Sequence, residues 1–446
     1  MPRAATNTRR SVPSGNRLGE RLRQLRVAAG MTQTELAGER FSKEYVSQIE
    51  RGKTRPTQET VEWLAQKLGV DPSFLERGVS ADERRRVETL LARAEALSEA
   101  HQYEQALEQF SSCKTAVLAT ALTELEVRHL SGEAWARVES GEVKEALELL
   151  NRARLLAEAP EFSDVDRAAI LFRLGVCRYQ LSSIATAIGL LNEALALAEG
   201  SQLPCDLLRA DILGWRSRCY RRQRDLEAAR EDVERALELA QAIDDPRKTA
   251  DTYFQASLVS ERMGHWVQAR NYAERAKTHY EQVNDERNVG RLLNNLGGLN
   301  FQLGKPEQAI EDLKNAYRVL LDKGSDADAA NVVASLAHVH LMTGEATTAE
   351  EEARHALSLM AERTDFLYHV APTQLVLGRA LMEQGRLDEA EEILLASDAS
   401  AEQLESLSHR AAAWMARGDL AAKRGEDRAA AKLYRQAAEA LQDVRF

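Results

Sequence analysis

Four hydrogen-bonding side chains recur at helical spacing near the N-terminus: Lys43, Glu44, Ser47 and Gln48. This spacing places them on one exposed side of a helix, with the first two at its leading end. Lysine can donate to guanine O6 and N7, glutamate can accept from cytosine N4, and glutamine can pair with adenine. The stretch that holds them, residues 32–53, therefore predicts a face that lies in a DNA groove.

A helix, a tight turn and a second helix are expected to position this face. Thr32 is a favourable N-cap residue, and Glu35 completes the capping-box pattern that opens the first helix. After a short turn with the sequence GERF, Ser42 caps the second helix and Gly52 ends it. The polar face is therefore expected to begin directly after a cap.

Three more short helices are expected around this pair. One precedes it and ends at Gly30, and two follow it, the last starting near Asp71 and Pro72. Their apolar residues recur with the period of amphipathic helices. The core positions expected from this pattern are Leu18, Leu22, Leu25, Leu36, Ala37, Val46, Ile49, Val61, Leu64, Ala65, Leu68, Phe74 and Leu75.

This arrangement resembles the helix-turn-helix domain of the Cro/Xre family, which has a lambda-repressor-like fold. The resemblance covers about residues 17–76. It rests on TQTELA at 32–37, SKEYVSQIERGK at 42–53 and LAQKLGVD at 64–71, which occur in the order and at the spacing of the family. The turn between the first two motifs is one residue shorter than is usual in the family.

The resemblance implies that Lys43, Glu44 and Gln48 read bases while neighbouring residues hold the phosphate backbone. It also implies an ion pair between Glu50 and Arg26 of the first helix, which we interpret as structural. For any one of the DNA-contacting positions, the alternative is an ordinary solvated side chain. The implied positions are Thr32, Gln33, Ser42, Lys43, Glu44, Ser47, Gln48, Arg51, Lys53, Thr54 and Arg55.

The charge of the chain is unevenly distributed, which fits a head that meets a polyanion. Residues 1–77 carry 14 Lys and Arg against 9 Asp and Glu, whereas the remainder carries 45 against 61. Residues 1–16 lack apolar periodicity and predict a disordered basic arm. Its three arginines, Arg3, Arg9 and Arg10, either contact DNA or belong to a solvated tail.

The rest of the chain repeats itself with a period of about 40 residues. A turn position is followed five residues later by alanine, and another small residue recurs in the preceding helix. Such regularity indicates a helical solenoid, because small side chains let antiparallel helices approach closely. The turn positions are His101, Gly141, Ser182, Arg224, Gly264, Gly304, Gly344, Gly385 and Gly425, and the alanines are Ala106, Ala146, Ala187, Ala229, Ala269, Ala309, Ala349, Ala390 and Ala430.

These offsets resemble those of the tetratricopeptide repeat. The resemblance implies a right-handed superhelical solenoid of about nine helical hairpins, and the long period predicts long helices. The chain is therefore expected to be all-α. It would contain a disordered arm (1–16), a five-helix DNA-binding domain (17–78), a linker (79–82) and a tetratricopeptide-repeat domain (83–446).

The resemblance also implies a concave groove, lined by the first helix of each hairpin, that holds peptides or partner helices. Arginines crowd residues 216–224, and with Asn294 and Asn295 they predict a pocket for a short peptide with a free carboxylate or acidic side chains. Alternatively, the aromatic residues pack between helices and the arginines pair with acidic neighbours. The predicted groove residues are Arg173, Tyr179, Trp215, Arg218, Arg221, Arg222, Phe254, Gln255, Arg262, Asn294, Asn295, Phe301 and His338.

Several classes of function find no support in the sequence. The four cysteines are far apart with no CxxC pair, which favours reduced thiols and predicts neither disulfides nor a metal site. Phosphate-binding, dinucleotide-binding and hydrolase motifs are missing, so we expect neither an enzyme nor a cofactor. No apolar run suits a membrane span or a signal peptide, so we expect a bacterial cytoplasmic protein, associated with the nucleoid when bound to DNA.

A Cro-like head joined to a tetratricopeptide solenoid resembles bacterial peptide-responsive quorum-sensing regulators of the Rap-, PlcR- and PrgX-like group. The resemblance implies a transcriptional regulator that senses a peptide or protein ligand and binds a palindromic operator as a homodimer. Two alternatives remain: a solenoid that binds a regulatory protein with no small ligand, and a scaffold that the head tethers to DNA.

Overall fold

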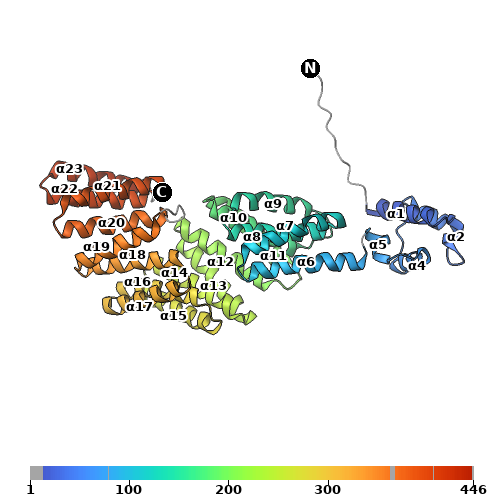
Figure 1. Cartoon of the computed structure of the whole chain (residues 1–446), viewed down its shortest axis with the longest axis horizontal. Helices are drawn as coiled ribbons and strands as arrows, with labels where there is room; N and C mark the ends of the chain where they lie inside the picture. The colour runs from blue at the N-terminus through green and yellow to red at the C-terminus, as the bar shows by residue number, and fades with distance from the viewer. Residues whose placement is uncertain (1–13, 79, 362–366, 405, 444–446) are drawn as a thin grey trace, which may run out of the picture. The chain divides into compact units, whose positions relative to one another are not determined.

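The computed structural model describes residues 14–78, 80–361, 367–404 and 406–443 (Figure 1). These residues form helices and turns, with no strand among them, so the predicted all-α class is confirmed. Within the same ranges, no helix is long and apolar enough to cross a membrane. The predicted arm with Arg3, Arg9 and Arg10 lies outside the described residues, apart from its last three positions.

Five helices form the N-terminal domain: α1 (Ser14–Ala28), α2 (Gln33–Ala37), α3 (Lys43–Glu50), α4 (Gln58–Leu68) and α5 (Pro72–Arg77). Both predicted caps are present. The Thr32 hydroxyl accepts from the Glu35 N–H at 3.2 Å, the Glu35 carboxylate accepts from the Thr32 N–H at 2.6 Å, and the Ser42 hydroxyl accepts from the Tyr45 N–H. Residues 14–16, expected to end the arm, instead lie in the first turn of α1.

The core of this domain follows the predicted apolar pattern with one exception. Ten of the expected positions are buried: Leu18, Leu22, Leu36, Ala37, Val46, Ile49, Val61, Leu64, Ala65 and Leu75. Leu25 and Leu68 are partly buried at its edge. The prediction for Phe74 is wrong, because this side chain is 37% exposed. In the short helix α5, Leu75 faces inward, and its neighbour Phe74 is turned about 100° away from that direction.

Within the described residues, eighteen helices follow, and they pair into nine hairpins as predicted. The hairpins of the first structural unit (residues 1–204) are α6 (Ala81–Glu99) with α7 (Tyr103–Thr120), α8 (Thr123–Glu139) with α9 (Val143–Leu156), and α10 (Asp164–Gln180) with α11 (Ile184–Gly200). Those of the second unit (residues 205–446) are α12 (Asp206–Gln223) with α13 (Leu226–Ile243), α14 (Pro246–Arg262) with α15 (Trp266–Gln282), α16 (Glu286–Gln302) with α17 (Pro306–Asp322), α18 (Asp326–Met342) with α19 (Ala346–Met360), α20 (Leu367–Glu383) with α21 (Leu387–Gln403), and α22 (Leu407–Lys423) with α23 (Asp427–Asp443). Helix α6 starts inside the predicted linker, because Ser80 caps it.

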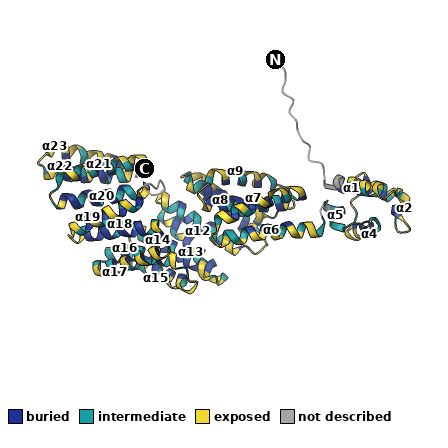
Figure 2. Cartoon of the chain, in the orientation of Figure 1, coloured by how far each residue is buried: buried dark blue, intermediate teal, exposed yellow. Residues whose placement is uncertain are grey.

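The recurring residues have the roles that the period predicts. All nine turn positions have positive φ, including the three that are not glycine: His101, Ser182 and Arg224. The nine alanines that follow are buried. Figure 2 shows buried residues along the helices of the hairpins. At Gly297, a Cβ would stand 2.6 Å from the Leu313 side chain, so the small residue of the first helix permits close packing. The repeat therefore supplies the frame on which the groove residues stand.

Candidate nucleic-acid interface and ligand groove

Helix α3 separates its polar residues from its apolar ones. Lys43, Glu44 and Gln48 are exposed, whereas Val46 and Ile49 are almost fully buried against the core. Ser47 is half-buried between the two faces. The predicted base-reading residues therefore lie together on the open side of α3, and its N-terminal turn carries the first two of them.

A second group of predicted DNA contacts follows the C-terminus of α3. Arg51, Lys53 and Arg55 are exposed on the turn that Gly52 makes with a φ of 66°. The Thr54 hydroxyl donates to Gln48 Oε1 at 3.0 Å, which orients the glutamine amide from this turn. Because the Gln48 amide nitrogen still has its donors, it can form one arm of a bidentate contact with adenine.

Glu50 joins three helices. Arg26 Nε of α1 donates to Glu50 Oε1 at 2.6 Å, and Gln33 Nε2 of α2 donates to Glu50 Oε2 at 2.8 Å. Burial by itself would raise the pKa of Glu50. The hydrogen bonds from Arg26 and Gln33, with the charges of Arg26 and Arg23, outweigh burial and hold this pKa below its ordinary value. The predicted pair is present, and Gln33 belongs to it as well as to the predicted phosphate contacts.

Sequence reasoning missed Gly19, which seats α3 on α1. A Cβ at this position would lie 2.7 Å from the Glu50 carbonyl oxygen and would also clash with the Ile49 carbonyl. Only glycine therefore allows the backbone of α1 to approach the end of the reading helix this closely. The signal in the sequence was a glycine inside a helical pattern, where its low helix propensity calls for a packing reason.

The predicted groove residues divide between the two structural units. Arg173 and Tyr179 belong to α10 of the first unit, and the other eleven belong to first helices of the second. On α12, the guanidinium of Arg218 lies 4.3 Å from the ring centre of Trp215. Arg216, which was not assigned to the groove, donates to both carboxylate oxygens of Asp232 at 2.7 and 2.6 Å. The arginine cluster is therefore partly structural.

The two adjacent asparagines of α16 have different surroundings. Asn295 accepts from the Ser257 hydroxyl at 3.1 Å and donates to Glu261 at 3.0 Å, so its amide bridges two hairpins. Asn294 Oδ1 is buried with no hydrogen-bond partner among the described residues. Since an unsatisfied buried oxygen is unfavourable, Asn294 is the asparagine that gains more from a ligand.

Phe301 and His338 line a cavity of about 320 Å³ between α16, α18 and α20. Their rings meet edge to face with centres 6.0 Å apart. Partial burial, with the nearby charge of Arg379, holds the pKa of His338 below its ordinary value, and burial does the same for the pKa of His369 across the cavity. Two neutral imidazoles and mostly apolar neighbours make this cavity suitable for an apolar side chain.

The remaining predicted groove residues differ in accessibility. Arg222 and Arg262 are exposed, and Gln255 is buried. Tyr179, Arg221 and Phe254 are partly exposed. Burial raises the pKa of Cys177 and Cys219 to about 11, so these thiols stay protonated. Among the described residues, no group of three or more His, Cys, Asp and Glu side chains could hold a metal ion.

Sequence families match both parts of the chain. A helix-turn-helix domain model matches residues 17–78, and tetratricopeptide-repeat models match residues 131–204, 208–282, 290–319 and 375–443. The chain therefore contains an N-terminal helix-turn-helix domain followed by tetratricopeptide repeats. No curated protein matches it in sequence.

The solved structures that are similar in fold include the following three. The apo form of RapI is 13% identical, with a TM-score of 0.61, and the match covers 80% of this chain and 98% of that one. The apo form of the quorum sensor NprR from B. thuringiensis is 14% identical, with a TM-score of 0.61 and coverage of 81% and 99%. The Rap conjugation gene regulator of the plasmid pLS20, in complex with the Phr* peptide, is 16% identical, with a TM-score of 0.52 and coverage of 81% and 96%.

Proposed function

We propose that this chain, in which a helix-turn-helix domain precedes tetratricopeptide repeats, is a sequence-specific DNA-binding transcriptional regulator. Its repeats would bind a peptide or protein ligand that controls operator binding. The geometry of α3 carries this proposal. Val46 and Ile49 seat the helix, while Lys43, Glu44 and Gln48 remain exposed with the donors and acceptors that base edges require.

In this mechanism the leading end of α3 enters the major groove. Arg51, Lys53 and Arg55, exposed beyond the other end, hold phosphates on either side of the groove. A homodimer would place two such heads on a palindromic operator in the bacterial cytoplasm, because two-fold protein symmetry matches two half-sites. A ligand that changes the packing of the repeats would change the spacing of the heads, and with it the affinity for DNA.

Two observations support a ligand in the repeats. Asn294 lies on α16, the first helix of its hairpin, and its buried Oδ1 has no hydrogen-bond partner among the described residues. The Rap conjugation gene regulator, which is similar in fold, was solved with a peptide. An extended peptide could donate a backbone N–H to Asn294, and its carboxylate could meet the arginines of α12.

The DNA-binding part is tested by the double variant Lys43→Ala, Gln48→Ala. Removing a side chain that hydrogen-bonds a base should weaken specific binding by about 1–3 kcal/mol per residue, and the consensus site selected from random DNA should change. Arg93→Ala, which removes an exposed arginine from α6, is the control and should select the wild-type site. An unchanged consensus in the double variant would show that α3 does not read bases in this orientation.

The ligand is sought by native mass spectrometry of the protein purified from the organism that encodes it. We expect a bound species that is absent from Asn294→Ala, with little change in stability, because the substitution removes an unsatisfied oxygen.

A fragment that ends at residue 78 should bind DNA weakly as a monomer if the repeats supply dimerisation. A dimeric fragment that binds as tightly as the whole chain would contradict this role of the repeats.

A further inference from the structure

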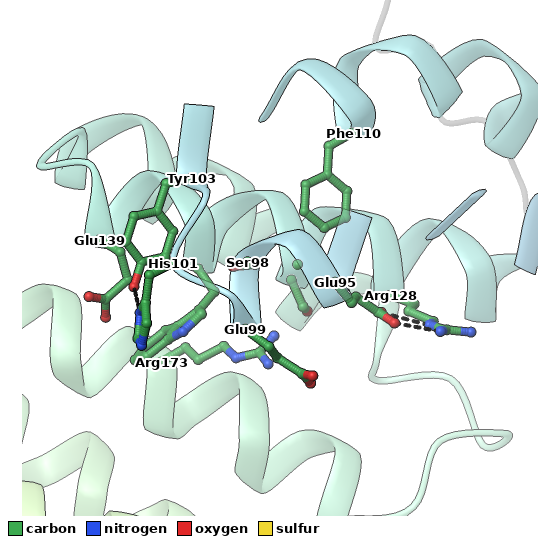
Figure 3. Close-up of a pocket in the computed structure, with 12 residues that line it drawn as sticks. Glu95, Ser98, Glu99, His101, Tyr103, Phe110, Arg128, Glu139 and Arg173 are labelled. Atoms are coloured by element: carbon green, nitrogen blue, oxygen red, sulfur yellow. Dashed lines mark hydrogen bonds and ion pairs between the residues drawn. The ribbon is translucent and has the colours of Figure 1, made fainter. Parts of the chain in front are cut away.

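The first unit contains a cavity of about 490 Å³ that the proposed function does not use (Figure 3). Side chains of α6, α8 and α10, the first helices of the three hairpins, line it together with residues of the first turn and of α7. Its volume falls in the range typical of small-molecule sites. We call it the Arg173 cavity.

Arg173 is the first unusual feature of this cavity. Its guanidinium lies 5.8 Å from the ring centre of Trp135 and makes no hydrogen bond or ion pair with any described residue. Arg128, the other arginine that lines the cavity, donates to both oxygens of Glu95 at 2.7 and 2.5 Å. Burial, only partly offset by the charge of Glu95, lowers the pKa of Arg173. Arg128 is therefore already paired with a carboxylate, whereas Arg173 is available to bind an anion.

Two hydroxyls are the second unusual feature. The Oγ atoms of Ser98 and Ser131 are buried and have no hydrogen-bond partner among the described residues, and Ser131 is only 8% exposed. By contrast, Ser335 of α18 donates to the Asn331 carbonyl one turn earlier at 3.1 Å. Because leaving a buried hydroxyl unsatisfied is unfavourable, a ligand with an acceptor would relieve both groups.

The walls of the cavity specify what accompanies that acceptor. Trp135 and Phe110 supply aromatic surface. The Phe110 ring can lie close against α8 because Gly132 has no side chain; a Cβ there would stand only 2.6 Å from the ring. Glu99 and Glu139 also line the cavity, so a multiply charged anion such as phosphate would be repelled. These surroundings suit a single negative charge on a flat apolar body.

We propose that the Arg173 cavity binds a small organic molecule that carries one carboxylate on an aromatic or flat apolar body. The carboxylate accepts from the Arg173 guanidinium and from the hydroxyls of Ser98 and Ser131, and the body packs against Trp135. The predicted groove included Arg173, but all the residues that line this cavity belong to the first unit, and its occupancy does not depend on DNA binding. A peptide C-terminus presents the same carboxylate, so the test must separate these two sources.

The test uses the full-length chain and a matched library of one- and two-ring aryl carboxylates with their primary amides, measured by calorimetry. We expect at least one acid to bind at least tenfold more tightly than its amide, since the amide lacks the charge that Arg173 pairs with. Arg173→Gln should abolish this preference, whereas Arg93→Gln on the exposed side of α6 should keep it. No acid preferred over its amide, or a preference that survives Arg173→Gln, would overturn the proposal.

Ser131→Ala separates binding from structure. Because this substitution removes an unsatisfied hydroxyl and introduces a good helix former, the unfolding temperature should stay equal or rise while acid affinity falls about tenfold. Ser140→Ala, outside the cavity, should leave affinity unchanged. An unchanged affinity in Ser131→Ala would refute the role of the hydroxyl. A hexapeptide pool with free and amidated C-termini completes the test: acid preference among peptides alone would overturn the small-molecule assignment.

Discussion

Two ion pairs with nearly equal burial show how the N-terminal domain (α1 to α5, the head) differs from the tetratricopeptide repeats (α6 to α23). Arg26 and Glu50 have side-chain exposures of 13% and 4%, and Arg216 and Asp232 have 14% and 5%. Glu50 also accepts from Gln33, so its carboxylate joins α1, α2 and α3. Asp232 joins only α12 and α13 of one hairpin. The buried ion pair of the head therefore connects three helices, whereas the buried ion pair of the repeats lies within one hairpin.

The largest effect expected from this difference follows removal of the carboxylates. Glu50→Gln and Asp232→Asn each remove the negative charge that pairs with a largely buried arginine, at a cost of about 3 kcal/mol. In Glu50→Gln, amide exchange should rise throughout the head and specific DNA binding should fall. In Asp232→Asn, faster exchange should stay within α12 and α13, and DNA affinity should be kept. Exchange that spreads through the whole chain in both variants would remove the contrast.

A slightly smaller effect is expected where the two regions use glycine. Gly19→Ala places a Cβ against two backbone carbonyls of α3, which cannot move like side chains, so we expect a loss of about 2–3 kcal/mol in the head. Gly189 in α11 has open space around its Cα, and Gly189→Ala should stabilise the first unit by about 0.5–1 kcal/mol. Thermal unfolding of both variants, followed by amide hydrogen exchange, tests these two predictions. A stable Gly19→Ala head would mean that α1 and α3 can separate at no cost in stability.

The frame of both regions could be predicted from the sequence because it depends on local spacing. Caps such as Thr32 and Ser42 act within one turn of their own helix, and each repeat alanine recurs at a fixed distance from its turn. The exposed residues of α3 followed from helical periodicity and needed no knowledge of other elements. Even the non-glycine turns at Ser182 and Arg224 were placed correctly by the period.

The rest depends on contacts between elements far apart in the sequence. Asn294 and Asn295 look equivalent in the sequence. Asn295 hydrogen-bonds Ser257 and Glu261 of the preceding hairpin, whereas Asn294 Oδ1 has no hydrogen-bond partner among the described residues. Trp135 comes directly after the small repeat residue Ala134, just as the predicted groove residue Arg218 comes directly after Ser217. This equivalent position could have marked Trp135 as a candidate ligand-contacting residue of the first unit. The two unsatisfied serine hydroxyls could not be predicted, because their burial depends on packing between helices that are far apart in the sequence.

As the pH falls, the repeats around α18 and α20 should lose stability before the head does. The lowered pKa of His338 and His369 means that their contribution is present above about pH 6.5 and is lost as the pH falls through the lowered values. The lowered pKa of Glu50 means that its contribution persists down to about pH 4.3 and is lost below that value. Exchange corrected for pH should therefore rise first around α18 and α20, and later in the head. The reverse order would contradict these assignments.

Glu50→Gln is the matched variant for the acid experiment. It should reduce the dependence of head stability on pH below about 4.3 without affecting α18 and α20. Some dependence should remain, because hydrogen bonds with Thr32 and Ser73 hold the pKa values of Glu35 and Asp71 below their ordinary values as well. A variant with the full wild-type dependence would show that Glu50 is not the main acid-sensitive group of the head.

The smallest effect concerns a turn where the repeats depart from their own rule. Arg224 has a φ of 66° at a position where six other repeats have glycine, and a side chain in this region is disfavoured by about 1 kcal/mol. Arg224→Gly should therefore stabilise the α12–α13 hairpin by about 0.5–1 kcal/mol, in contrast to Gln223→Gly, which should destabilise it because residue 223 is helical. Thermal unfolding of both variants tests this sign change across adjacent positions. Because the head has its own core, exchange within α1 to α5 should stay the same in both, and a change there would mean that the two regions are not independent.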